Sequence, residues 1–146
     1  MIDIALFGQP RAGCAYLLRS TRVALIDAGT AAGAPQWLRR LEGTRLDFLF
    51  VTHAHLDHAG GAGHVAAAHP EVTVVAHPRA LPHLADPSRI TEAARQASPD
   101  FARLYGAPLP VPRQQLVGAA DGEWFSLGGS PKLQARETPG PAPPHA

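Results

Sequence analysis

The sequence predicts an α+β domain with a mixed β-sheet and helices on one face. Short apolar runs of strand length alternate with helix-like segments along most of the chain. Two neighbouring apolar runs near the N-terminus are joined by a polar corner, whereas the later runs are separated by helices. Hydrophobic residues make up 45% and charged residues 17% of the 146 residues, a balance typical of one globular domain with its own core.

Strands come first along the chain. The weakly alternating run at 2–7 predicts one strand. The apolar runs at 14–20 and 21–27 predict a hairpin that turns at the polar corner 19–21, and Asp27 ends its second arm.

A helix and a buried strand are expected next. Segment 34–43 predicts a helix, since Pro35 suits its first position and Gly43 suits its C-terminal cap. The run at 47–52 is continuously apolar and of strand length, so we expect a strand that is buried on both faces.

The middle of the chain repeats this alternation. Segment 61–69 predicts a helix that ends before Pro70, and the β-branched run 71–77 predicts a further strand. Segment 86–98 predicts a helix, which Pro99 interrupts and which resumes briefly afterwards.

The last third of the chain has a different pattern. Segment 114–137 predicts short strands, with a turn at Asp121-Gly122. The final nine residues, 138–146, include four prolines and cannot form regular structure. We therefore divide the chain into a domain at 1–137 and a Pro-rich tail.

Charge and composition exclude several classes of function. The net charge is +1, and the twelve Arg and the single Lys132 are scattered, which gives no electrostatic basis for binding nucleic acid or a membrane surface. The single Cys14 lies in an apolar run and reads as an inert buried thiol. The N-terminus lacks the pattern of a signal peptide and no run reaches membrane-spanning length, so we expect a cytoplasmic protein.

The candidate chemistry lies in the string "THAHLDHAGG", directly after the apolar run at 47–52. His53 and His55 point to the same side of an extended chain, so both can reach one metal ion. Asp57 and His58 follow where the chain turns toward a helix, and they suit a second ion. Imidazole and carboxylate are ligands for zinc, iron and manganese alike, so one or two Zn²⁺ are expected, with Fe or Mn as alternatives.

Other histidines favour a structural role. His64, His69 and His83 are isolated and read as hydrogen-bonded polar residues. His77, at the end of a predicted strand, stays open between a ligand and a structural residue, with the structural role favoured. A structural role for the cluster at 53–58 is the alternative to metal binding there, but the density of ligands after a buried strand favours a metal.

The string "THAHLDHAGG" resembles the signature of the metallo-β-lactamase superfamily, whose fold is shared with glyoxalase-II-like thioesterases. The segment 23–29, "VALIDAG", is similar to an early element of that family, and 121–129 with 133–140 resembles the stretch leading to its next ligand. Segment 77–90 is similar to the glyoxalase-II-like hydrolases. The resemblance implies the N-terminal half of an αββα sandwich.

The resemblance also implies roles for individual residues. His53 and His55 would bind the first metal, and Asp57 and His58 the second. Asp57 would also orient or deprotonate the attacking water. Asp27 would support the ligand loop through hydrogen bonds, with a purely local turn-capping role as the alternative.

Two departures from the family pattern shape the functional expectation. Pro141 replaces the histidine of a T-P-G-H motif, which leaves His145 as the substitute ligand. The family's second half is expected to be missing, which would leave one sheet face exposed and would favour a homodimer or a partner chain. We expect a hydrolase of a small ester, thioester, lactam-type or phosphoester substrate, or alternatively an inactive metal-binding remnant.

Overall fold

The computed structural model describes residues 1–138 and contains two sheets. Six strands form one sheet in the order β1-β2-β3-β4-β5-β6, and β7 pairs with β8 separately. The strands are β1 (Ile2–Asp3), β2 (Cys14–Arg19), β3 (Val23–Ile26), β4 (Phe48–Phe50), β5 (Thr73–Ala76), β6 (Leu116–Gly118), β7 (Trp124–Ser126) and β8 (Lys132–Gln134).

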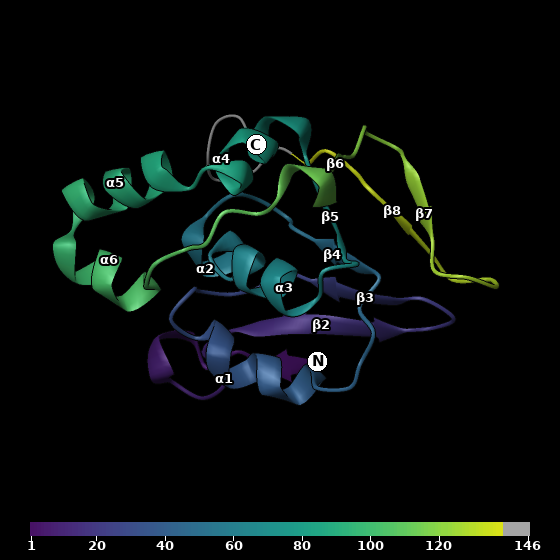
Figure 1. The fold of residues 1–146 in the computed structure, drawn as a ribbon, viewed down its shortest axis with the longest axis horizontal. Helices are drawn as coiled ribbons and strands as arrows, with labels where there is room; N and C mark the ends of the chain where they lie inside the picture. Colours follow the sequence, from purple (N-terminus) through teal and green to yellow (C-terminus); the bar gives the residue numbers. More distant parts are fainter. Residues whose placement is uncertain (139–146) are drawn as a thin grey trace.

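The helices follow the strands in the predicted alternation. In Figure 1, α1 and α3 lie beside the large sheet, α5 and α6 extend to the left, and β7–β8 stand on the right. The α-helices are α1 (Ala34–Leu38), α2 (Leu56–Ala59), α3 (Ala62–Ala68), α4 (Leu81–Ala85), α5 (Ser88–Ala97) and α6 (Pro99–Tyr105). Short 3₁₀ turns are η1 (Leu6–Gly8), η2 (Arg39–Leu41), η3 (Pro78–Ala80) and η4 (Arg113–Gln115).

The pairing of the strands confirms the mixed sheet. Strands β2 and β3 form the predicted antiparallel hairpin, while β3, β4, β5 and β6 run parallel. Their register places Leu25, Leu49 and Val74 in one row, and all three side chains are fully buried. On this face the core includes Trp37 from α1 and Val65 from α3, so the predicted helix-covered face is confirmed.

The opposite face of the sheet is only partly covered. Phe48 and Phe50 of β4 contact Phe125 of β7, with ring centroids 6.3 and 5.2 Å apart, so the small sheet covers the centre of this face. Tyr16 and Val117 stay 52% and 38% exposed on it. The expected burial of 47–52 on both faces is therefore wrong in part, because Phe48 and Phe50 are only half-buried.

The first predicted strand is much shorter than expected. Only Ile2–Asp3 pairs, because the Asp3 carboxylate accepts the backbone N–H groups of Ala5 and Arg11 and starts a local turn. Ala5 and Phe7 then adopt positive φ angles of 44° and 54°, which ends the extended chain.

The predicted helices are present with two differences. The helix at 34–43 divides into α1 and a 3₁₀ turn, and Gly43 follows with φ +72°, as a C-terminal glycine requires. Helix α4 was not predicted from the sequence. Pro78 and Pro82 each occupy the first turn of a short helix, where the missing N–H is not needed.

The last third divides between the two sheets. Strand β6 joins the large sheet parallel to β5, whereas β7 and β8 pair antiparallel with each other. The predicted turn at Asp121-Gly122 is present, with Gly122 at φ +81°, but it connects the two sheets instead of closing a hairpin. Residues 127–131 close the β7–β8 hairpin, where Gly128 has φ +82°.

Buried Gln115 ties this segment to helix α3. Its amide nitrogen faces the carbonyl oxygens of Ala66, His69, Pro70 and Val72 at 3.1–3.4 Å. The last carbonyls of a helix have no partner within it, so this side chain caps α3 from 45 residues away or more.

The predicted tail at 138–146 lies almost wholly outside the described residues, and so do Pro141 and His145. The division at 1–137 therefore stays a prediction. Within residues 1–138, none of the helices combines the length and the apolar character that crossing a membrane would take.

Candidate metal centre

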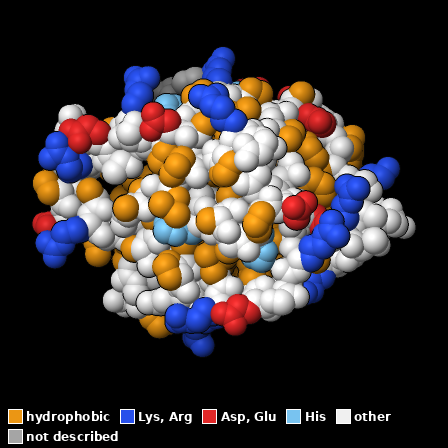
Figure 2. Space-filling model, in the orientation of Figure 1, with side chains coloured by type: hydrophobic (Ala, Val, Ile, Leu, Met, Phe, Trp, Pro, Cys, Tyr) orange, Lys and Arg blue, Asp and Glu red, His pale blue; other side chains and the backbone are white. Residues whose placement is uncertain are grey.

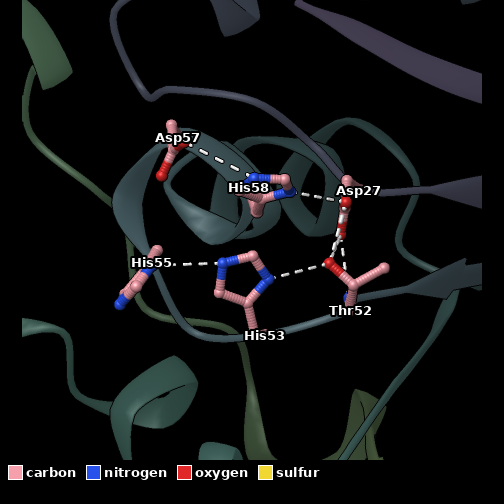
Figure 3. Close-up of polar contacts among 6 residues, drawn as sticks. All are labelled: Asp27, Thr52, His53, His55, Asp57 and His58. Carbon is pink, nitrogen blue, oxygen red and sulfur yellow. Dashed lines mark hydrogen bonds and ion pairs between the residues drawn. The ribbon is translucent and has the colours of Figure 1, made fainter. Parts of the chain in front are cut away.

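Parallel strands bring the candidate residues together. Asp27 follows β3, and Thr52 and His53 follow β4; because these strands are parallel neighbours, their carboxyl ends lie at one edge of the sheet. The short helix α2 then carries Asp57 and His58 back toward Asp27. Figure 3 shows the resulting chain of contacts, which runs Asp57, His58, Asp27, Thr52, His53 and His55.

The first pair of candidate ligands is His53 and His55. Nε2 of His53 lies 3.1 Å from Nδ1 of His55. Two nitrogens bound to one tetrahedral zinc, each at 2.0–2.1 Å, lie about 3.3 Å apart. The two rings therefore present suitable atoms at a suitable separation for sharing an ion.

The second pair is His58 and Asp57. Nε2 of His58 lies 3.4 Å from Oδ2 of Asp57, which also suits two ligands of one ion. The pairs are neighbours, since the ring centroids of His53 and His58 are 4.2 Å apart.

The pairs do not form a complete ligand set. Among residues 1–138, no group of three or more His, Cys, Asp or Glu side chains is arranged to hold one ion. The assignment of His53, His55, Asp57 and His58 as metal ligands therefore stays a prediction, which the separation within each pair supports.

Asp27 holds both pairs in place. Its carboxylate accepts the backbone N–H of Thr52 at 2.8 Å, the Thr52 hydroxyl at 2.9 Å and Nδ1–H of His58 at 2.7 Å. Its side chain is only 13% exposed. The backbone of Asp27 is in the left-handed region, with φ 60°, a conformation that costs a non-glycine residue about 1 kcal/mol or more. These contacts agree with the supporting role expected for Asp27 and go beyond a local turn cap.

The hydrogen bonds fix which ring nitrogens carry protons. An ionised carboxylate only accepts, so the Thr52 hydroxyl donates to Asp27 and its oxygen is left to accept Nδ1–H of His53 at 3.0 Å. Nε2 of His53 and Nε2 of His58 then carry lone pairs, which is the form that binds a metal.

Thr52 is a residue of the candidate site that sequence reasoning did not single out. The signal was a hydroxyl directly before the first histidine, but its two partners, Asp27 and His53, come together only in the folded chain. Tyr105 packs edge-on against Phe7, with ring centroids 5.4 Å apart. Burial, with a further contribution from the charge of Asp57, raises the pKa of Tyr105.

The imidazoles of His53 and His58 differ in basicity. Burial, with a further contribution from the His58 and His55 rings, lowers the pKa of His53. The hydrogen bond to Asp27 raises the pKa of His58, against the effect of burial and with help from the charges of Asp27 and Asp57. A proton in the metal-free cluster therefore resides on His58 before His53.

The double glycine serves close packing instead of a tight turn. Gly60 and Gly61 have ordinary negative φ angles of −57° and −82°. A Cβ on Gly61 would lie 2.3 Å from the carbonyl oxygen of Ala28, and Gly61 N–H donates to Gly29 at 2.8 Å. The loop after β3 thus lies directly on the α2–α3 corner, which keeps Asp27 beside His58.

The sequence matches the profile of the metallo-beta-lactamase superfamily over residues 8–146. The chain belongs to this superfamily. Its members generally bind divalent metals, often zinc.

Known metallo-beta-lactamase structures share the fold of this chain. An archaeal superfamily protein from Sulfolobus tokodaii is 21% identical with a TM-score of 0.73, over 86% of this chain and 49% of that one. A metallo-beta-lactamase with a HARLDQ motif from Cronobacter sakazakii is 32% identical with a TM-score of 0.61, over 86% of this chain and 44% of that one. A protein named diflavin flavoprotein A 1 from Thermosynechococcus vestitus is 36% identical over 75 residues, 49% of this chain and 13% of that protein.

The chain spans about half the length of the solved metallo-beta-lactamase structures that it matches.

His64 and His77 lie outside the cluster of six side chains. Nε2–H of His64 donates to the carbonyl oxygen of Ala107, 3.3 Å away, and Nδ1 of His77 accepts the Arg79 N–H. The candidate ligand His145 falls outside the described residues.

Proposed function

We propose that this chain carries the site of a metal-dependent hydrolase, which cleaves an ester, thioester, lactam-type or phosphoester bond of a small molecule with water. The proposal rests on two ligand pairs in a member of the metallo-beta-lactamase superfamily. The ligand atoms lie 3.1 Å apart in one pair and 3.4 Å apart in the other, and the carboxylate of Asp27 orients a histidine of each pair. The chain spans about half the length of the matched structures, so the activity of the whole protein is part of this proposal.

Each residue of the candidate site has a separate role. His53 and His55 would hold one ion, and His58 and Asp57 a second. A divalent ion bound there would polarise the substrate oxygen and lower the pKa of a water molecule. Asp57 also orients the attacking water and accepts its proton, while Asp27 keeps both ring systems in the correct tautomer.

Zinc is the metal that we propose, with iron or manganese as alternatives. The donor set of three imidazoles and one carboxylate suits all three. Two ligands of one ion do not make a closed zinc site, which takes four, and a catalytic zinc keeps at least three protein ligands. Each pair therefore needs a further ligand from outside the described residues.

A second candidate is metal binding without catalysis, in a chain that associates with another copy. Two observations favour it. No three-ligand group occurs among residues 1–138, and Tyr16 and Val117 leave apolar surface on the uncovered sheet face. A homodimer through this face would cover both side chains.

Metal content and turnover separate the two candidates. Purified chain is dialysed against zinc, its metal is counted by mass spectrometry, and hydrolysis of 4-nitrophenyl acetate is followed with and without chelator. Bound metal with chelator-sensitive turnover supports the hydrolase, and bound metal without turnover supports the second candidate. His53→Ala should lower the metal content and abolish turnover, whereas the matched control His83→Ala should change neither. Light scattering on the same samples reports a dimer.

A further inference from the structure

A pocket lies next to the candidate metal centre, at the carboxyl ends of the central strands. Its volume is about 390 Å³. Thr52 and His53 line it from the end of β4, Ala76 and His77 from the end of β5, and segment 133–138 from β8 onward. A molecule in this pocket would therefore touch one of the candidate metal ligands directly.

The side chains from the sheet make the pocket apolar. Ile26, Phe50 and Val75 lie in one row on the sheet face that β7–β8 cover, and Ala119 and Leu133 add to the lining. Small-molecule sites typically have this size and this mainly apolar surface, with a few polar groups that fix orientation. The lining favours an apolar group as the ligand.

Two charged side chains of the pocket wall, those of Arg136 and Asp121, interact with each other. Nε of Arg136 lies 3.7 Å from Oδ1 of Asp121, and the same oxygen accepts the backbone N–H of Glu137 at 2.9 Å. The one positive charge of the wall thus already has a carboxylate beside it. An anionic ligand would have to compete with Asp121 and approach Glu137, so the wall favours an uncharged ligand.

His77 supplies the polar group. Its Nδ1 accepts the backbone N–H of Arg79 at 3.2 Å, which caps the 3₁₀ turn after β5. When one ring nitrogen of an uncharged imidazole accepts, the other carries the proton. Nε2–H of His77 is therefore a donor, and it makes no hydrogen bond to any of residues 1–138.

We propose that the pocket binds the uncharged, apolar acyl or aryl part of the substrate, and that Nε2–H of His77 donates a hydrogen bond to an oxygen of that part. The substrate class rests on the proposed function, since only an adjoining hydrolytic centre makes the bound group a substrate. The pocket then favours esters and thioesters with a bulky apolar acyl group over small, highly charged phosphoesters.

Two probes of matched shape test the hydrogen bond on chelator-treated protein. 4-Phenyl-2-butanone has an aryl group and one carbonyl, and butylbenzene lacks the carbonyl. Both are titrated into ¹⁵N-labelled wild-type protein and into His77→Asn and His77→Gln. Asparagine keeps an acceptor for the Arg79 N–H but cannot reach the pocket with a donor, whereas glutamine keeps a donor at the position of Nε2.

We expect both probes to shift the amide signals of the pocket lining in wild-type protein. His77→Asn should reduce the preference for the ketone about three- to tenfold, the range for one neutral hydrogen bond, and His77→Gln should retain much of it. An unchanged preference in His77→Asn overturns the role of His77. Absence of binding by wild-type protein overturns the pocket itself.

A blocking variant locates the binding. Ala120→Trp places an indole at the pocket wall and should weaken both probes at least tenfold, while Leu109→Trp, at an exposed position outside the lining, should weaken neither. Equal affinities in both variants overturn the proposal. Because no metal or turnover is involved, a failure of the hydrolase leaves these results intact, and the reverse also holds.

Discussion

Nδ1 of His58 lies 2.7 Å from Oδ2 of Asp27, and the two residues are 31 positions apart in the sequence. The same carboxylate binds Thr52, which in turn binds His53. One acid directly after β3 therefore orients a histidine of each ligand pair. The predictions below follow from this relationship and from the packing that maintains it.

Replacing Asp27 by asparagine should weaken metal binding about 10- to 100-fold, because partners of ligating histidines typically contribute this much. The asparagine amide cannot accept all of the hydrogen bonds that the carboxylate accepts, so the His58 and Thr52 side chains lose their fixed orientation. Competition with a chromophoric zinc chelator measures the affinity. Asp100→Asn, at an exposed position in α6, is the control and should bind zinc as the wild type does. Equal affinity in Asp27→Asn would contradict the supporting role.

Thr52→Val should weaken zinc binding about tenfold, whereas Thr52→Ser should be close to wild type. Valine preserves the volume and the backbone N–H bond to Asp27 but removes the hydroxyl that accepts Nδ1–H of His53. Serine keeps that hydroxyl. The same chelator competition measures both variants, and a serine variant as weak as the valine variant would show that the hydroxyl has no such role.

The raised pKa of His58 predicts a pH dependence of the metal-free protein. Because the folded pKa lies above the ordinary histidine value of about 6.5, the Asp27–His58 contact stabilises the fold fully below about pH 6.5. This stability is lost as the pH rises through the raised pKa. Thermal unfolding of wild type and His58→Gln should therefore differ most in mildly acidic buffer, and the difference should shrink at higher pH.

The contribution of His53 to stability should have the opposite pH dependence. Its folded pKa is lowered, so the stabilisation from its neutral ring is present above pH 6.5 and is lost as the pH falls through the lowered pKa. NMR titration of the ring C–H signals should find His58 titrating above His53 in chelator-treated protein. Asp27→Asn should move the His58 midpoint downward, and a midpoint that stays in place would exclude Asp27 as the cause.

Gln115→Leu should lower the free energy of unfolding by about 1–3 kcal/mol, because it removes the donor that faces the carbonyls at the end of α3 and in the turn after it. Gln115→Glu should cost more, since a carboxylate oxygen would face those carbonyls. Urea unfolding measures both. The neighbouring Gln114 is exposed, and Gln114→Leu should change the stability by only a few tenths of a kcal/mol. A cost equal to that control would show that the cap is unimportant.

Much of the fold follows from local pattern. The β2–β3 hairpin, strand β4 and the helix before Pro70 were predictable because apolar period, turn residues and proline positions act over a few residues. The shortened β1 was not predictable, since the Asp3 carboxylate must first meet the N–H of Arg11, eight residues on. Helix α4 was not predicted, because its five residues are too few to show a helical apolar period.

The sequence alone determined the superfamily and the chemical character of the candidate site, because His53, His55, Asp57 and His58 lie within six consecutive positions after an apolar strand. Only the tertiary structure decided how these groups are used. Parallel pairing of β3 and β4 brought Asp27 to them from 26 or more positions away, and this carboxylate fixes the ring protons through contacts that no local spacing encodes. The ligands consequently lie as two oriented pairs, a property of the packed chain and not of its motif.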